Sequence, residues 1–187
     1  RLLRDHTGPD EILASGVFVD PDGTYREGNL SRVAVASRVL SRVKMSHGTT
    51  QVVLQGLGRV RLEEVTASRP YFKARVDCPP GPEDDNAVTR DLVSRVTALV
   101  ETLVSVDRRY PDEFVRVVHF NVEDPSRCAD LIADTVQFGY SEKRQVLEAT
   151  EVSPRLELLA ELLEHEIHRA QVAGEVRMKS EGFIDRT

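Results

Sequence analysis

The segment Pro79-Pro80-Gly81-Pro82-Glu83-Asp84-Asp85-Asn86 constrains the fold of this chain more than any other. Its prolines and glycine are unsuited to a strand ladder or a helix interior, so it marks a boundary. Before it, apolar residues recur at every second position, and after it at every third or fourth. We therefore predict a β-rich subdomain over residues 1–78, a linker over 79–86 and a helical bundle over 87–187.

Alternating apolar and polar residues predict the strands of the first part. We expect strands over 11–20, 32–45, 49–57, around Val60 and Leu62, and over 71–78. In 32–45, the odd-numbered valines should form a dry face and the basic residues a wet face. Ser46-His47-Gly48 is typical of a hairpin turn, and Gly56-Leu57-Gly58 predicts a tight bend or bulge between two strands. These strands suggest a small antiparallel sheet or pseudo-barrel.

Spacings of three and four predict the helices of the second part. One apolar helix face carries Leu92, Val96, Leu99, Leu103 and Val106. Further helices are expected after Tyr110-Pro111, from Asp124-Pro125, from a cap at Ser141, and from Ser153-Pro154 toward Lys179. The last helix thins to Ala170, Val172, Ala173 and Val176, so its second half is expected to leave the bundle and seek a partner helix.

Charge and composition narrow the function. The chain has 25 basic and 31 acidic residues in 187, a net charge of −6, which gives no general attraction to nucleic acid or anionic lipid. No apolar run approaches the roughly 18 residues of a membrane span. Two cysteines, Cys78 and Cys128, are too few for a disulfide scaffold, so a reducing, intracellular setting is expected. Because residue 1 is Arg and not Met, the chain is expected to be a fragment or a processed product.

We find no motif that predicts catalysis. The chain lacks a GxSxG elbow and a P-loop, and Cys128 lies on an apolar helix stripe where a core role is expected. His165 and His168, three residues apart, could share a metal, but they do not form the HExxH motif, and a solvated charged face is the alternative. No catalytic, cofactor-binding or metal-binding residue is therefore assigned.

Two stretches carry a resemblance to a known family. The run Thr49 to Leu62 resembles the strand, Glu-Gly-Leu turn and Arg-containing strand of the N-terminal substrate-binding domain of Lon proteases, with Gln55 where Glu is usual. The series Asp124-Pro125 to Ala133, Glu142 to Glu148 and Arg155 to Leu159 is similar to that family in order and spacing. The family opens with an apolar Leu-Pro-rich strand before its first helix, whereas this chain starts at Arg1-Leu2-Leu3 and is expected to begin inside that helix. Either the sheet lacks a strand or the sequence is incomplete. Gly174 and Ser180-Glu181-Gly182-Phe183 are expected to interrupt the long helix.

The resemblance implies an α+β fold, with a PUA-like β pseudo-barrel followed by a helical bundle that ends in one long helix. It implies a non-catalytic domain that holds unfolded or degron-bearing proteins for an ATP-dependent serine protease. ATP and Mg are expected only in downstream domains, and a hexamer is expected in the parent protein. The implied setting is the bacterial cytoplasm, with the mitochondrial matrix as the alternative.

Four aromatic residues are candidate substrate contacts: Tyr25, Tyr71, Phe138 and Tyr140. They lie at predicted strand ends or in loops, where apolar contacts among polar groups suit unfolded clients, and packing at the edge of the core is the alternative. Self-association through the long helix would add avidity. Two other functions stay open: a stand-alone Lon-domain-like binding protein and a PUA-like RNA-binding module. We expect neither nucleic acid nor membrane as a partner.

Overall fold

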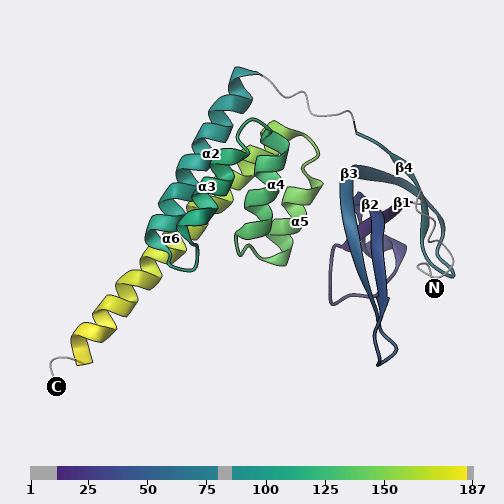
Figure 1. The fold of residues 1–187 in the computed structure, drawn as a ribbon, viewed down its shortest axis with the longest axis horizontal. Helices are drawn as coiled ribbons and strands as arrows, with labels where there is room; N and C mark the ends of the chain where they lie inside the picture. Colours follow the sequence, from purple (N-terminus) through teal and green to yellow (C-terminus); the bar gives the residue numbers. More distant parts are fainter. Residues whose placement is uncertain (1–11, 80–85, 185–187) are drawn as a thin grey trace. The chain divides into compact units, whose positions relative to one another are not determined.

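The computed structural model describes residues 12–79 and 86–184 (Figure 1). The chain divides into two compact units, Arg1–Gly81 and Pro82–Thr187. The first holds strands and the second holds helices, so the prediction of an α+β fold is confirmed. Most of the predicted linker, residues 80–85, lies outside the described residues.

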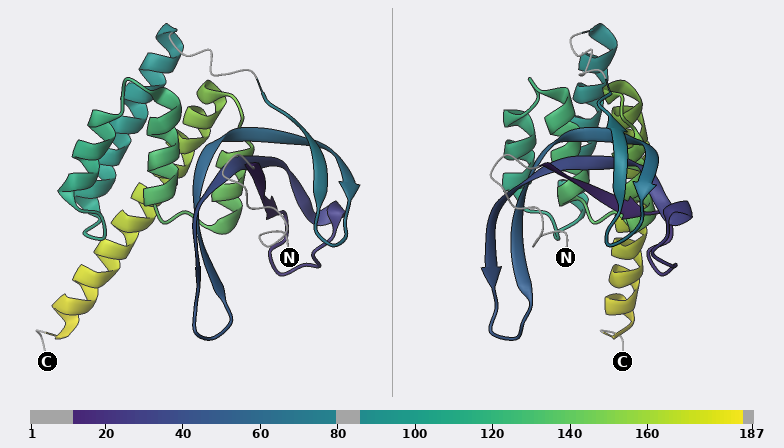
Figure 2. Two further views of the ribbon diagram at one scale, coloured as in Figure 1. Left: turned by 45° about the vertical axis from the view of Figure 1, so that its right-hand side comes forward. Right: turned by 90° about the vertical axis from the view of Figure 1, so that its right-hand side faces the viewer.

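The β unit is a four-stranded antiparallel sheet in which strand order follows chain order. Its elements are β1 (Ile12–Phe18), the short 3-10 helix η1 (Glu27–Asn29), β2 (Leu30–Lys44), β3 (Thr50–Ala67) and β4 (Lys73–Asp77). The sheet curls strongly, and β2 and β3 extend as one long hairpin (Figure 2). The predicted hairpin turn is confirmed, because Met45 N donates to Thr49 O at 2.8 Å and Gly48 adopts a φ of 81°.

The prediction of two strands around Gly56-Leu57-Gly58 is wrong, since β3 runs unbroken through this segment. The alternative of a bulge is confirmed there. Ala36 pairs with Gly58 while the adjacent Ser37 pairs with Gly56, so Leu57 is the extra residue. A bulge bends the strand without ending the ladder, so Gly56 and Gly58 both lie inside one strand.

The predicted dry face of β2 is also wrong. The core of the β unit consists of Ala34, Val60 and Leu62, with Ala34 at an even-numbered position. Val33 is buried as well, but Val43 is 53% exposed and Met45 is 47% exposed. A second bulge at Leu40 shifts the register, because Val39 pairs with Leu54 and Ser41 with Val53. A side chain beyond a bulge no longer keeps the face that simple alternation assigns to it.

The helical unit contains α2 (Ala87–Val106), α3 (Asp112–Phe120), α4 (Pro125–Thr135), α5 (Tyr140–Glu148) and α6 (Val152–Ile184). Asn86 caps α2, and its side chain accepts from Thr89 N at 2.9 Å. The predicted start of α4 is confirmed, because Asp124 accepts from Arg127 N at 2.9 Å. These caps satisfy end N–H groups that the helices leave unpaired.

The cap predicted at Ser141 is wrong. Gly139 precedes the first turn of α5, and its N–H donates to Glu142 Oε2 at 2.6 Å. The Glu142 carboxylate therefore satisfies the N–H of the residue that precedes α5, and Ser141 lies inside the helix. Within the described residues, no helix is long and apolar enough to cross a bilayer.

One hydrophobic core holds the helical unit together. Its fully buried members include Val96, Leu103 and Val118, with Leu156, Leu159 and Leu163 from the first half of α6. Ile167 is the last side chain of α6 that the structure describes as buried, and residues 171–176 are exposed. The second half of α6 leaves the bundle as predicted (Figures 1 and 2). The predicted interruptions at Gly174 and at residues 180–183 are wrong, because α6 is continuous to Ile184.

Candidate functional site

The outer half of the β2–β3 hairpin, residues 39–58, is here called the ribbon. β1 pairs with β2 only as far as Arg38, and β4 pairs with β3 only from Arg61 onward. Among the described residues, the ribbon therefore has two strands and two unpaired edges. Such a segment receives no burial from neighbouring strands.

Large apolar side chains lie exposed along the ribbon. Their exposed fractions run from 43% to 58%, and the residues are Leu40, Val43, Met45, Val53, Leu54 and Leu57. Single exposed apolar residues are ordinary on protein surfaces, but six on one two-stranded segment make it a candidate surface for a partner. Of the ten large apolar side chains that are exposed in the described part of the β unit, six lie on the ribbon.

The register places apolar side chains on both faces of the ribbon. Ser41 pairs with Val53 and Val43 pairs with Gln51, so the two valines share one face. Leu54 lies on the opposite face, because adjacent strand residues point to opposite sides. Neither face of the ribbon is a core face, so an extended polypeptide can be met from either side.

Tyr25 and Tyr71, predicted to contact substrate, both belong to the β unit. Tyr25 is 78% exposed and packs edge-on against Phe18, with ring centroids 4.9 Å apart. Tyr71 is half-buried, and Lys73 Nζ lies 5.6 Å from the centre of its ring. Tyr25 therefore presents an open aromatic surface, whereas part of the Tyr71 ring is already covered.

Phe138 and Tyr140 belong to the helical unit. Phe138 is only 6% exposed and is part of the hydrophobic core. Tyr140 begins α5 and is 45% exposed. Of these two side chains, Tyr140 alone has substantial surface to offer a client.

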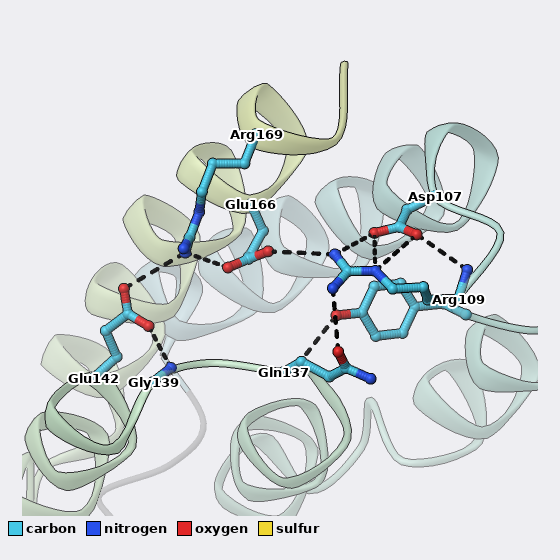
Figure 3. A network of polar contacts seen from close by, with 8 residues as sticks. Asp107, Arg109, Gln137, Gly139, Glu142, Glu166 and Arg169 are labelled. Atoms are coloured by element: carbon cyan, nitrogen blue, oxygen red, sulfur yellow. Dashed lines mark hydrogen bonds and ion pairs between the residues drawn. The ribbon is translucent and has the colours of Figure 1, made fainter. Parts of the chain in front are cut away.

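A network of polar contacts joins four segments of the helical unit beside the point where α6 leaves the bundle (Figure 3). At its centre, Glu166 of α6 is 4% exposed. It forms ion pairs with Arg169 on one side and with Arg109 at 3.8 Å on the other. Arg169 also reaches Glu142 of α5 at 3.6 Å. Buried carboxylates are stable only when paired, which accounts for two arginines around one glutamate.

The other side of the network is built around Arg109. Its guanidinium donates to both carboxylate oxygens of Asp107, at 2.6 to 3.1 Å, and to Gln137 Oε1 at 3.1 Å. The hydrogen bond from Arg109 holds the pKa of Asp107 below its ordinary value of 3.8, although burial acts in the opposite direction. The same pair raises the pKa of Arg109. Both groups stay charged at neutral pH, so the network works as a fixed clamp.

A second buried cation, Arg155, anchors the first turn of α6. Its guanidinium donates to the carbonyl oxygens of Ala149 and Thr150, at 2.9 and 3.0 Å. It also reaches Ser126 Oγ at 3.0 Å and Asp130 Oδ1 at 3.2 Å, both on α4. One side chain thus fixes α4, α6 and the α5–α6 connection together, which is a structural role.

The described residues contain no arrangement that points to catalysis. Burial raises the pKa of the Cys128 thiol to about 11, so it stays protonated at neutral pH and is a poor nucleophile. In the part of the chain described, no group of three His, Cys, Asp or Glu side chains is placed to hold a metal ion. His165 and His168 both lie on the exposed side of α6.

The ribbon was not predicted from the sequence. The alternating residues of β2 were interpreted as a core face, whereas the structure exposes their outer part. One signal was present: residues 28–62 contain no acidic residue, which is unusual in a chain where acids outnumber bases. A core face does not require charges of one sign, whereas a surface that binds a charged partner can require them.

Comparison with known proteins gives one family. The model of the ATP-dependent protease La (LON) substrate-binding domain matches residues 14–165. The chain is 30% identical to Lon protease 2 of Herpetosiphon aurantiacus, covering 84% of this chain and 19% of that protein. It is 28% identical to Lon protease of Escherichia coli K12, covering 85% and 20%. The chain thus spans about a fifth of the length of these curated relatives.

A solved structure shows the same fold. The N terminal domain of Mycobacterium avium complex Lon protease aligns with a TM-score of 0.63 at 24% sequence identity. The alignment covers 74% of this chain and 73% of that one. The likeness supports the expected architecture of a curled sheet followed by a helical bundle.

Proposed function

From the premise that this chain belongs to the LON substrate-binding domain family, we propose that it binds unfolded protein segments for an ATP-dependent serine protease of which it is a part. In this proposal the chain itself is non-catalytic and needs no cofactor. ATP and Mg would act in other domains of the parent protein, in the bacterial cytoplasm.

The observation that carries the proposal is the exposed apolar surface of the ribbon. Unfolded proteins differ from native ones chiefly in the apolar side chains and unpaired backbone groups that they present to water. The ribbon offers both complementary features: side chains such as Val43 and Val53, about half exposed, and strand edges without a partner among the described residues. Burial of such side chains contributes roughly 25 cal/mol per Å², so several weak contacts add up.

The four aromatic candidates remain part of the proposal to different degrees. Tyr25 and Tyr140 are exposed enough to touch a client, and Tyr71 can offer one part of its ring. Phe138 could do so only after a local opening of the helical core, because its ring is buried. We rank the ribbon first and Phe138 last.

Assembly through the second half of α6 is the other part of the proposal. Val172 is 45% exposed and Val176 is 60% exposed on a helix that has left its bundle. A second copy would cover these side chains and increase avidity for clients that have several binding segments. Sedimentation of the chain at high concentration tests this: self-association that Val172→Ser with Val176→Ser removes supports it, and a strict monomer contradicts it.

The binding function is tested with a fluorescently labelled protein in its native form and in a form held unfolded by reduction and alkylation. We expect fluorescence anisotropy to show binding of the unfolded form alone. Val43→Ser with Val53→Ser should weaken that binding about tenfold. Val88→Ser with Val117→Ser is the matched control, since these valines are similarly exposed on α2 and α3. Equal binding of native and unfolded forms, or hydrolysis of either by the purified chain, would overturn the proposal.

A further inference from the structure

We infer that the ribbon selects extended client segments in which apolar residues are flanked by acidic ones, and that these segments add as a strand along β3. This inference rests on the proposed function and names the class of client. It follows from the charge, the register and the free edge of the ribbon.

The charge of the chain is strongly divided. Residues 28–62 hold six basic residues and no acidic one, a net charge of +6, although the whole chain carries −6. The other residues therefore sum to −12. The basic residues are Arg32, Arg38, Arg42, Lys44, Arg59 and Arg61. Such a local concentration of one sign attracts the opposite sign and rejects its own.

The register puts a cation and an exposed apolar side chain on each face of the β2–β3 hairpin, two residues apart along β3 on one face and four residues apart on the other. Arg38 pairs with Gln55, so it shares a face with Val53, two residues along β3. Lys44 pairs with Thr50, so it shares the other face with Leu54. Among the described residues, neither Arg38 nor Lys44 has a side-chain ion pair or hydrogen bond within the chain. Both cations are therefore available to a carboxylate from outside.

The backbone of β3 offers the docking edge. β4 pairs with β3 only from Arg61 to Ala67, and the chain soon reaches Pro79, which has no N–H to extend the ladder. The outer edge of β3 between Thr50 and Gly58 thus has no ladder partner among the described residues. Addition of a strand to an exposed edge is a recurrent mode of peptide recognition.

Two other occupants fit less well. A second copy would bring two ribbons of the same charge together, and basic residues on an edge oppose such pairing. Single-stranded nucleic acid would meet the positive charge, but its binding depends on aromatic side chains that stack on bases. Residues 39–58 contain no Phe, Tyr or Trp. An acidic, apolar peptide satisfies both the charge and the apolar side chains.

The test uses the whole chain and three fluorescent twelve-residue peptides. Each has a central run that alternates Leu and Thr, flanked at both ends by Glu, Gln or Lys pairs. Two exposed ion pairs contribute roughly 0.2–1 kcal/mol each, so we expect the Glu peptide to bind about three- to tenfold more tightly than the Gln peptide. The Lys peptide should bind most weakly, and 0.5 M NaCl should reduce the difference.

Two double variants locate the effect. Arg38→Gln with Lys44→Gln should abolish the preference for Glu over Gln flanks. Arg108→Gln with Arg127→Gln changes the net charge equally in the helical unit and should leave the preference intact. A Glu peptide methylated on alternate backbone nitrogens of its central run should lose binding, because it cannot complete a ladder.

Each contrary result is decisive. Equal affinity for the three peptides would overturn the acidic client class, and full binding of the methylated peptide would overturn strand addition. Equal or tighter binding of a single-stranded RNA of similar charge would make the surface a general polyanion site and would also overturn the inference. The proposed function can survive all of these results, because it is judged separately by binding of unfolded over native protein.

Discussion

Arg155 and Asp130 form an ion pair of 3.2 Å in which the arginine side chain is 2% exposed and the aspartate side chain is 46% exposed. Because Arg155 is buried while Asp130 is half exposed, this ion pair is only one of the contacts that fix the Arg155 side chain. Two backbone carbonyls and a serine hydroxyl accept its other hydrogen bonds. Arg155 is thus a buried connector between helices, and Asp130 is its solvent-facing partner.

We expect Arg155→Met to lower the free energy of unfolding of the helical unit by about 2–4 kcal/mol, because several buried acceptors lose their donor at once. Asp130→Asn should cost less than about 1 kcal/mol, since its carboxylate is half exposed. Urea unfolding followed by circular dichroism measures both. Arg127→Met is the control. Arg127 is an exposed residue on α4, the helix that carries Asp130, and its replacement should change the free energy of unfolding by less than about 0.5 kcal/mol. Equal losses for Arg155→Met and Arg127→Met would contradict the connector role.

The Asp107–Arg109 pair predicts a dependence of stability on pH. The pKa of Asp107 in the folded protein lies below its ordinary value of 3.8, chiefly because Arg109 donates hydrogen bonds to it. Its contribution is therefore fully present above about pH 4 and is lost as the pH falls through the lowered folded pKa. We expect Asp107→Asn to be less stable than the natural chain at pH 7 by about 1–3 kcal/mol, with a smaller difference at pH 3. A difference that stays constant from pH 7 to pH 3 would rule this out.

The loop between β1 and β2 depends on Gly23. A Cβ there would meet Asp20 Oδ2 at 2.7 Å and Asn29 Nδ2 at 2.9 Å. Asn29 cannot easily yield, because its amide donates to Asp20 O at 2.7 Å and accepts from Asp20 N at 2.8 Å. We expect Gly23→Ala to destabilise the loop by about 1–2 kcal/mol, seen as faster amide exchange at Val19, which donates to Asn29 O.

Gly28→Ala serves as the control for this loop. No atom lies within 4 Å of the Cβ that it would add. Its amide exchange at Val19 should match that of the natural chain. Similar effects of the two substitutions would show that the contacts around Gly23 do not stabilise the loop.

The helical unit could be predicted from sequence because its signals are local. Helix α4 starts at Pro125 because the side chain of the preceding Asp124 accepts a hydrogen bond from a backbone N–H three residues along the chain. The leucines at 156, 159 and 163 repeat with the period of one helix. The role of Arg155 could not be predicted, because its acceptors lie 5 to 29 residues away in sequence. Pattern within one element does not report contacts between elements.

The β unit was harder to predict because its bulges are invisible to alternation. Each extra residue, Leu40 in β2 and Leu57 in β3, reverses the face of everything beyond it. Alternation finds the strands, but it cannot report that β1 and β4 stop short of the ribbon, which leaves the apolar side chains there exposed. The four aromatic candidates came from residue type and position alone, which cannot distinguish the buried Phe138 from the exposed Tyr25.

The two cysteines should differ sharply in reactivity. Cys78 is exposed, whereas Cys128 is buried and burial raises its pKa to about 11. Since the thiolate is the reactive form, we expect iodoacetamide at pH 8 to modify Cys78 and to leave Cys128 unmodified in the folded protein. Mass spectrometry of the natural chain and of Cys78→Ser measures this. Addition of urea should make Cys128 react, and rapid labelling of native Cys78→Ser would contradict its burial.

The continuity of α6 through Gly174 gives a final prediction. A glycine inside a helix costs roughly 0.5–1 kcal/mol relative to alanine, and the Cβ that alanine would add meets nothing within 4 Å beyond its chain neighbours and the backbone of its own helix. We expect Gly174→Ala to slow amide exchange across residues 171–176 about two- to fivefold. Global unfolding should change little, because these residues are exposed and lie beyond the buried core. Ala173→Gly is the matched reverse change and should speed exchange in the same residues. Unchanged exchange in both variants would mean that this part of α6 is not helical in solution.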